Sequence, residues 1–159
     1  MTAALVLLEP FVRDGEASGF SKLLFRLALL RPWEPAAWRA YYKKLYPTRR
    51  DGRYDAHFTE AMGSLRKPSR WEAFRKTART SHASVEVRLG EVHAPALVVM
   101  GSSDPDFADP RGDAQWIAGK LQAKVLMVPG AGHYPQAEFP DVVSPAVVSL
   151  SQEFKPTLS

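Results

Sequence analysis

A carboxylate and a histidine stand in two loops of similar design, 29 positions apart in the sequence. Asp104 lies in MGSSDPDF, directly after the apolar run Ala96–Met100, and His133 lies in VPGAGHYP, directly after Lys124–Val128. A loop that only connects two elements needs Gly, Pro, Asn or Asp and gains nothing from an imidazole. A carboxylate beside a histidine fixes the tautomer of the ring and stabilises its protonated form. These two residue types therefore suit acid–base chemistry.

The two apolar runs are predicted to be parallel strands, because the segment between them reads as a helix within 110–121. A strand–helix–strand unit implies a right-handed crossover, and the carboxyl ends of its strands lie at the edge where α/β folds bind ligands. We therefore expect Asp104 and His133 to be hydrogen-bonded neighbours at that edge. The alternative is that Asp104 only opens the turn before Pro105 and that His133 is an incidental loop residue.

The chain divides into three zones. Residues 1–17 hold one strand, Leu5–Leu8, whose continuous apolar run fits a parallel strand covered on both faces. Residues 18–84 show no strand pattern and are predicted to be helical. Residues 85–159 alternate strands and helices, and they close with a helix that has Ser144 as N-cap and Pro145 at its first position.

The helical zone is predicted to form four short helices, at 19–30, 34–46, 54–65 and 69–79, the last with Ser69 as its N-cap. Short aromatic-rich helices of this kind do not look like crossovers in a parallel sheet. They look like an inserted lid, and some of its aromatic side chains are expected to line a pocket. These aromatic residues are Trp33, Trp38, Tyr41, Tyr42, Trp71 and Phe74.

Composition excludes several classes of site. The chain has 159 residues, 45% apolar and 24% charged, which suits one globular domain or one domain with an inserted subdomain. It has no cysteine, so disulfides, thiolate metal sites and a cysteine nucleophile are excluded. The apolar run before Glu9 is only six residues long, too short for a signal peptide or a membrane span, and a cytoplasmic location is the simplest expectation.

The positive charge is concentrated in the helical zone. Twelve Lys and Arg and only four Asp and Glu lie between Arg39 and Arg79, whereas the whole chain has a net charge of +4. We interpret this block as the solvated outer face of helices. Binding of nucleic acid is the alternative, but the block lacks a recognition motif and the interleaved aromatic and basic residues that single strands require.

Three stretches resemble the α/β-hydrolase family, specifically its esterase, lipase and cofactor-free haloperoxidase-like branch. APALVVMGSSDPDF and VLMVPGAGHYPQAEFPD resemble the acid and histidine segments, and AALVLLEPFVRDG resembles the strand that follows the nucleophile's helix. The resemblance implies a partial α/β-hydrolase fold with about three parallel strands, flanking helices and an inserted all-helical cap. It implies Asp104 as the acid and His133 as the base, because the triad runs Ser, Asp or Glu, then His.

The resemblance also bears on the other aspartates of the acid loop and on the residues that would bind substrate. Asp106 and Asp109 lie in the acid loop and are interpreted as a turn residue and an N-cap. Phe107, Tyr134, Trp38 and Tyr42 are the expected substrate-binding residues. No cofactor and no metal is implied.

The nucleophile of the family has no counterpart in these residues. It sits in G-x-S-x-G between a strand and a helix, and that pattern occurs nowhere in the sequence; AMGSL and VMGSSD come nearest. The expected function is hydrolysis of an ester or similar acyl substrate in which an N-terminal half, absent from this chain, supplies the nucleophile. The alternative is a non-catalytic binding or assembly module. Without that half, Leu5–Leu8 would be an unpaired sheet edge, so we expect a homo-oligomer or a complex with a separate chain.

Overall fold

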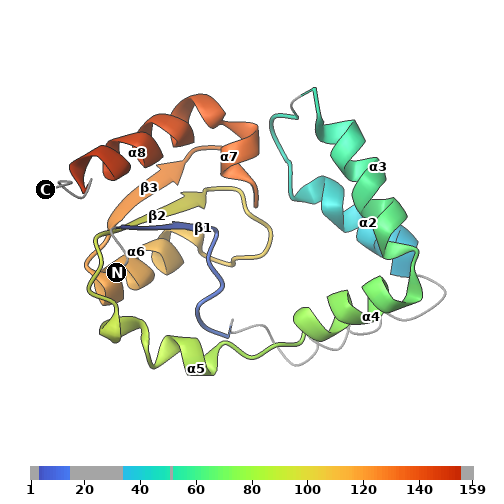
Figure 1. Cartoon of the computed structure of the whole chain (residues 1–159). Helices are drawn as coiled ribbons and strands as arrows, with labels where there is room; N and C mark the ends of the chain where they lie inside the picture. The colour runs from blue at the N-terminus through green and yellow to red at the C-terminus, as the bar shows by residue number, and fades with distance from the viewer. Residues whose placement is uncertain (1–3, 15–33, 51, 155–159) are drawn as a thin grey trace, which may run out of the picture.

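A computed structural model describes residues 4–14, 34–50 and 52–154. Three strands, β1 (Leu5–Leu8), β2 (Ala96–Gly101) and β3 (Lys124–Val128), form one parallel sheet in the order β1-β2-β3 (Figure 1). This arrangement confirms the predicted α/β class and the three predicted strands. In the register, Leu8 of β1 lies opposite Val99 of β2, and Gly101 of β2 lies opposite Val128 of β3.

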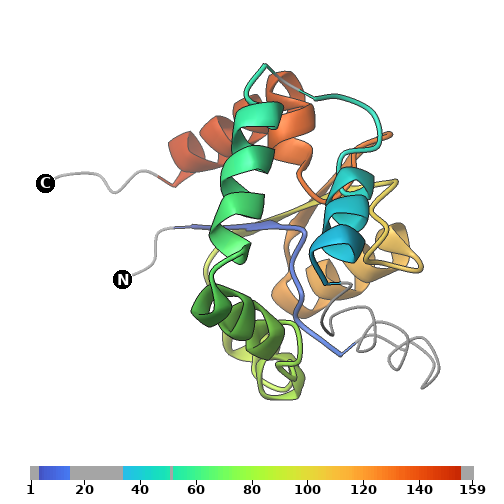
Figure 2. The same cartoon turned by 90° about the vertical axis from the view of Figure 1, so that its right-hand side faces the viewer.

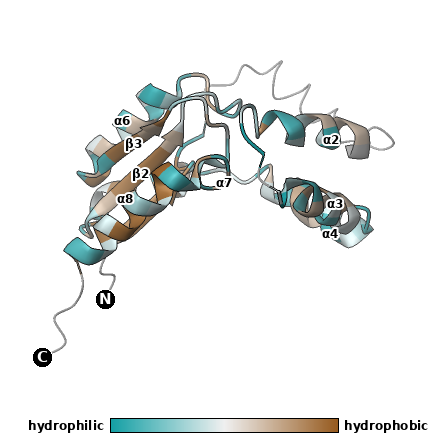
Figure 3. Ribbon diagram, turned by 90° about the horizontal axis from the view of Figure 1, so that it is seen from above, coloured by the Kyte–Doolittle hydropathy of each residue, from teal (hydrophilic) through white to brown (hydrophobic). Residues whose placement is uncertain are grey.

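The central strand β2 is buried along its whole length. Its side chains alternate between two apolar clusters, as a period of two residues requires. Val98 and Met100 pack against α6 (Pro110–Leu121) on one face, whereas Leu97 and Val99 pack against α8 (Pro140–Glu153) on the other. The strands are the most apolar segments in Figure 3, between the two helices. Burial on both faces explains why the strand reads as an uninterrupted apolar run.

The helix α6 begins where the acid loop ends. The Asp109 carboxylate accepts a hydrogen bond from the backbone N–H of Gly112 (3.0 Å), which confirms the predicted N-cap. The helix ends at Gln122, whose left-handed backbone (φ 51°) is a common helix stop. The acid loop therefore runs only from the end of β2 to Asp109.

Two predicted N-caps are wrong, and proline is the reason. The helix α4 (Pro68–Thr77) begins one residue before Ser69, with Lys67 in the N-cap position and no side-chain cap. Its first residue is a proline, which needs no backbone N–H there and has a preset φ.

The closing helix also starts earlier than predicted. It begins at Pro140, so Ser144 is not its N-cap and Pro145 lies inside the helix rather than at its first position. A proline at an interior position removes one hydrogen bond to the preceding turn. The short helices α5 (Ala83–Glu86) and α7 (Pro135–Glu138) and a 3₁₀ turn (Leu89–Glu91) were not predicted.

Three helices form a separate group beyond the carboxyl ends of the strands, and we call this group the cap (Figures 1 and 2). They are α2 (Glu34–Lys44), α3 (Tyr54–Leu65) and α4, close to the ranges predicted at 34–46, 54–65 and 69–79. Buried Trp71 and Met62 belong to the helices α4 and α3. The predicted helix at 19–30 and Trp33 lie outside the described residues, as does the start of the zone predicted at 18–84.

The cap carries much of the positive charge at its surface. Some of these cations have partners within the chain: Arg49 pairs with Asp141, Lys76 pairs with Glu72, and Arg39 lies over the ring of Phe58. Among the helices that the structure describes, none has the length and apolar character needed to cross a bilayer.

The outer side of β1 is an open edge among the described residues, since β1 pairs only with β2 there. Leu5 and Glu9 donate their backbone N–H groups toward the β2 side, to Pro95 O and Val99 O. By alternation, the N–H groups of Val6 and Leu8 point to the outer side. Unpaired apolar edges of this kind recruit further strands.

We therefore propose that another chain pairs with this edge, and we predict that the 159-residue chain alone forms a homodimer or larger assembly. Leu8→Pro should shift it toward monomer, because proline removes an outward N–H and leaves the bonds to β2 intact. Light scattering at micromolar concentration checks both statements. A monodisperse wild-type monomer would contradict the proposal.

Candidate active site

The loops after β2 and β3 lie side by side because the pairing of the strands continues beyond their ends. The backbone N–H of Ser102 donates to Val128 O (3.0 Å), and that of Ser103 donates to Ala131 O (2.9 Å). The two backbones approach so closely at Gly101 that a Cβ there would lie 2.4 Å from the carbonyl oxygens of Ala131 and Gly132. Only glycine fits at this point.

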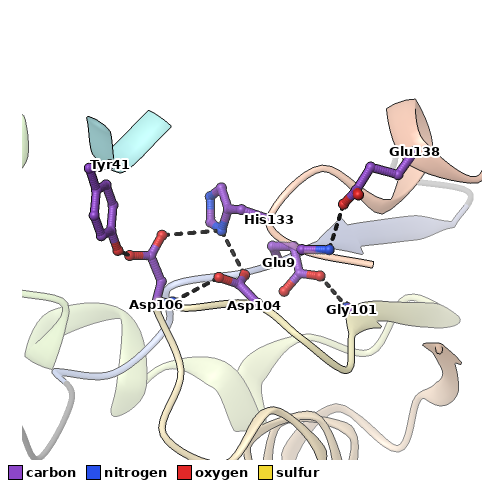
Figure 4. Close-up of polar contacts among 8 residues, drawn as sticks. Glu9, Tyr41, Gly101, Asp104, Asp106, His133 and Glu138 are labelled. Atoms are coloured by element: carbon purple, nitrogen blue, oxygen red, sulfur yellow. Dashed lines mark hydrogen bonds and ion pairs between the residues drawn. The ribbon is translucent and has the colours of Figure 1, made fainter. Parts of the chain in front are cut away.

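This approach brings the predicted acid and base together. His133 Nδ1 lies 2.7 Å from Asp104 Oδ2 (Figure 4). The Asp104 side chain is completely buried, whereas 17% of the His133 side chain is exposed. The second oxygen of Asp104 accepts the backbone N–H of Asp106 (2.8 Å). The contact expected from the two loops is present, and both oxygens of the carboxylate are engaged.

The Asp104 carboxylate controls the protonation of the ring. Burial lowers the pKa of His133, but the hydrogen bond and the charge of Asp104, together with the charge of Asp106, raise it by more. A proton on Nδ1 pointing at Asp104 leaves a lone pair on Nε2, and none of the residues described hydrogen-bonds to Nε2. The ring is therefore arranged to take up a proton at Nε2.

Asp106 is interpreted from the sequence as a turn residue, but its side chain contacts both the histidine and the cap. Its Oδ2 lies 3.4 Å from His133 Nδ1, and its Oδ1 accepts the hydroxyl of Tyr41 from the cap. Burial raises the pKa of Asp106, and the Tyr41 hydrogen bond partly offsets this rise. Burial, and then the hydrogen bond to Asp106, raise the pKa of Tyr41. Asp104 remains the closer carboxylate, and Asp106 connects the base to the cap.

Glu138 is a buried residue that the sequence interpretation did not single out. Its Oε1 accepts the backbone N–H of Gly132 (2.5 Å), and its Oε2 accepts those of Thr48 (3.0 Å) and Arg49 (3.1 Å). One carboxylate therefore joins the loop that carries the histidine to the segment that follows α2. Its sequence signal is only a glutamate in the short helix that opens at Pro135.

The same segment contacts the histidine loop through its backbone. The His133 N–H donates to Leu45 O (3.0 Å), and Thr48 Oγ1 donates to Gly130 O (2.6 Å). A Cβ on Gly132 would lie 2.4 Å from Leu45 O, so this glycine permits the close approach. The segment after α2 thus holds the backbone of the histidine loop from Gly130 to His133.

Glu9, which follows β1, also reaches the site. Only 3% of its surface is exposed, and its Oε1 accepts the backbone N–H of Gly101. Burial raises the pKa of Glu9 to about 9; the Gly101 bond opposes this rise, and the neighbouring Asp104 and Asp106 add to it. Its backbone is left-handed (φ 46°), which costs a residue with a Cβ about 1–2 kcal/mol. Sequence reasoning treated Glu9 only as the end of the apolar run.

Glu9, Asp104 and His133 also have the spacing of metal ligands. One possible ligand atom from each lies within 4.8 Å of the other two. However, Nδ1 and the Asp104 oxygen are only 2.7 Å apart, which is a hydrogen-bond distance. Two ligands of one tetrahedral zinc ion would stand about 3.3 Å apart. The geometry therefore fits a proton between them better than an ion.

A cavity of about 600 Å³ opens beside His133. Of the predicted substrate-binding residues, Trp38 and Tyr134 line it, and Tyr41 and Phe74 contribute further walls from the cap. Tyr42 instead lines a second cavity of about 400 Å³, which also contacts Tyr134. Phe107 lines neither of these two cavities.

Phe11 is a wall of the cavity that the sequence interpretation missed. Its ring stacks on His133 (centroids 5.3 Å apart) and on Phe107 (5.2 Å). Phe107 thus reaches the site through its contact with Phe11. Phe11 also lies 44% exposed, so it presents apolar surface next to the imidazole.

Comparisons with known proteins bear on the family and the fold. The sequence model of the alpha/beta hydrolase family matches residues 1–146. No curated protein sequence matches the chain.

Solved structures share the fold at low sequence identity. Bromoperoxidase from Bacillus anthracis is 13% identical, with a TM-score of 0.72 over 94% of this chain and 58% of that protein. MGS-M2, an alpha/beta hydrolase enzyme from a Medee basin deep-sea metagenome library, is 15% identical, with a TM-score of 0.67 over 94% and 56%. Est816, described as an N-acyl homoserine lactone degrading enzyme, is 16% identical, with a TM-score of 0.60 over 84% and 51%. The chain spans a little over half the length of each.

We predict that Asp104→Asn lowers the pKa of His133 and destabilises the fold more at about pH 5 than at about pH 9. The folded-state pKa of His133 is raised, so its stabilising contribution is complete below the unfolded-state value and disappears as the pH rises through the folded-state value. NMR titration and denaturant unfolding at the two pH values measure both effects. Asp109→Asn, which keeps its cap, is the matched control and should show no such dependence. An unchanged pKa of His133 in Asp104→Asn would contradict the electrostatic account.

Proposed function

This chain belongs to the alpha/beta hydrolase family, and on that premise we propose that it carries the acid and base of an acyl hydrolase. Asp104 would be the acid and His133 the base, acting on an ester or similar acyl compound. The observation that carries the proposal is the 2.7 Å contact between them at the mouth of a cavity walled by aromatic side chains.

The chemistry follows the order of a serine-hydrolase triad. His133 Nε2 takes the proton of an attacking hydroxyl, while that oxygen bonds to the acyl carbon. Asp104 holds Nδ1–H and stabilises the imidazolium that forms. The proton then passes from Nε2 to the leaving oxygen as the acyl carbon–oxygen bond breaks. Tyr41 and Asp106 keep a second negative charge near the imidazolium.

The attacking hydroxyl would come from outside these 159 residues. The sequence has no G-x-S-x-G, the turn on which the family presents its serine. We propose that the N-terminal half of the fold, in the same or a separate polypeptide, supplies it and pairs with the open edge of β1.

The aromatic walls of the cavity favour a substrate with an apolar or aromatic group. Trp38, Phe74 and Phe11 offer apolar surface, and the lining residue Arg13 is already paired with Asp113. Polar residues also line the cavity, among them Arg79, Ser81 and His82. Small-molecule sites typically combine apolar walls with polar groups that fix the orientation of the ligand.

A non-catalytic binding module is the second candidate. It is favoured by the lack of G-x-S-x-G in these residues and shares the same cavity. The two candidates differ in whether turnover appears once a nucleophile is supplied.

We predict that the chain alone hydrolyses p-nitrophenyl acetate close to the uncatalysed rate and is not labelled by a serine-directed phosphonate. Loss of the serine from a triad lowers kcat on the order of a millionfold. With a polypeptide that carries the G-x-S-x-G half, hydrolysis should appear and should be lost in His133→Ala. Turnover that survives His133→Ala would contradict the proposed base. Binding of an ester without turnover in the combined protein would favour the binding module.

We also predict that phenyl acetate binds beside His133 and shifts the NMR signals of its ring. Trp38→Ala should weaken this binding about tenfold or more, since a lost aromatic contact is worth roughly 1.4 kcal/mol or more. Phe154→Ala removes an exposed aromatic side chain that does not line the cavity and is the matched control. Equal binding by the two variants would place the ester elsewhere.

A further inference from the structure

We propose that Glu9 is a positioning residue for the Asp104–His133 pair: a neutral carboxylic acid that donates a hydrogen bond to the Asp104 carboxylate. The inference rests on the proposed function, since it assigns Glu9 a role in holding the acid. It concerns a side chain that directly follows β1, so the segments after all three strands would contribute to the site.

The first observation is the environment of the two Glu9 oxygens. Oε1 accepts the backbone N–H of Gly101. Oε2 is buried, and no described residue donates a hydrogen bond to it. The carboxyl groups of Glu9 and Asp104 lie side by side (Figure 4), and one oxygen of each is within 4.8 Å of the other. A proton on Oε2 would give this oxygen an acceptor and remove the repulsion between the two groups.

The second observation is the balance of charge around Glu9. The titratable groups that face it are Asp104 and Asp106 from the loop after β2 and His133 from the loop after β3. Two carboxylates and one imidazolium already leave an excess of negative charge there. A third buried carboxylate would be repelled, so the neutral acid is favoured. Burial, with the charges of Asp104 and Asp106 adding to it, raises the pKa of Glu9 to about 9.

The third observation is the strained backbone. Glu9 adopts φ 46° although it carries a Cβ, at a position where a glycine would be unstrained. Its backbone N–H donates to Val99 O (3.0 Å), so the strained residue is tied to β2 through both backbone and side chain. Strained residues of this kind persist where surrounding contacts hold them, often at functional sites.

The arrangement gives Asp104 a third hydrogen bond. The backbone N–H of Asp106 and the ring of His133 contact the other sides of its carboxylate. A donor from Glu9 would restrict the rotation of the carboxylate and keep Oδ2 directed at the imidazole. A buried neutral acid that donates a hydrogen bond is chemically reasonable where its site is apolar and anionic.

The test compares Glu9→Gln with the wild-type chain. Glutamine keeps the acceptor for Gly101 and a donor for Asp104, so it mimics the neutral acid. The wild type should take up one proton at Glu9 on folding, whereas the variant should not. The ratio of the wild-type to the variant unfolding constant should therefore rise about tenfold per pH unit between about pH 5 and about pH 8. The pKa of His133, followed by NMR in the same samples, should be little changed.

Glu138→Gln is the matched control. Glu138 is the other buried glutamate among the described residues, and its two oxygens accept three backbone N–H groups. In Glu138→Gln the side-chain NH₂ would replace one of these oxygens and would point a donor at a donor. This variant should be less stable than the wild type. If the ratio of the wild-type to the variant unfolding constant rose equally with pH for Glu9→Gln and Glu138→Gln, the assignment to Glu9 would be overturned.

Three other results would overturn the proposal. A ratio of unfolding constants that is flat with pH, together with a drop of about one unit or more in the pKa of His133 in Glu9→Gln, would show that Glu9 is ionised. Zinc would provide the second such result. If Zn²⁺ stabilised the wild type and bound His133 Nδ1, and if Glu9→Gln abolished both effects, the group Glu9, Asp104 and His133 would be a metal site. If Glu9→Gln does not fold, the ¹³C shift of the Glu9 carboxyl in the wild type answers the same question, since a carboxyl ionised at about pH 7 overturns the proposal. None of these measurements needs a substrate, so their failure is separable from failure of the proposed hydrolase function.

Discussion

The parallel pairing of β2 with β3 is the constraint on which the rest of the site depends. It ends with Gly101 opposite Val128 and continues into the loops through backbone bonds from Ser102 and Ser103. Because of this continuation, Asp104 and His133 meet at hydrogen-bond distance although 29 positions separate them. A shift of one residue in the register would turn the side chains of β3 to the opposite faces and carry the histidine away from the acid.

Polar contacts then tie three parts of the chain to this pairing. Glu138 joins the histidine loop to the segment after α2, Asp106 joins the base to Tyr41 of the cap, and Glu9 joins β1 to the end of β2. Each of these carboxyl groups is partly or fully buried, and an unsatisfied buried polar group is costly. The segment after α2 therefore cannot move far from the histidine loop without leaving Oε2 of Glu138 unpaired.

Much of this arrangement could be predicted from the sequence because it follows from local patterns. The apolar runs of β2 and β3, the helix between them and the N-cap Asp109 fix where Asp104 and His133 emerge. Glu9 and Glu138 could not be predicted, because most of their partners are backbone N–H groups from distant segments, and no residue pattern identifies such donors. The wrong N-caps of α4 and α8 have a local reason: a proline at the first position starts a helix without help from a serine. Tyr42 and Phe107 share the aromatic character of Trp38, but only packing decides which ring lines the cavity beside His133.

The central claim is that Asp104 holds a proton on His133 Nδ1 and leaves Nε2 free to act as a base. The ¹⁵N chemical shifts of the neutral His133 ring report the tautomer directly. We predict that the neutral ring carries its proton on Nδ1, with a downfield proton signal that disappears in Asp104→Asn. A neutral ring with its proton on Nε2, unaffected by Asp104→Asn, would contradict the account.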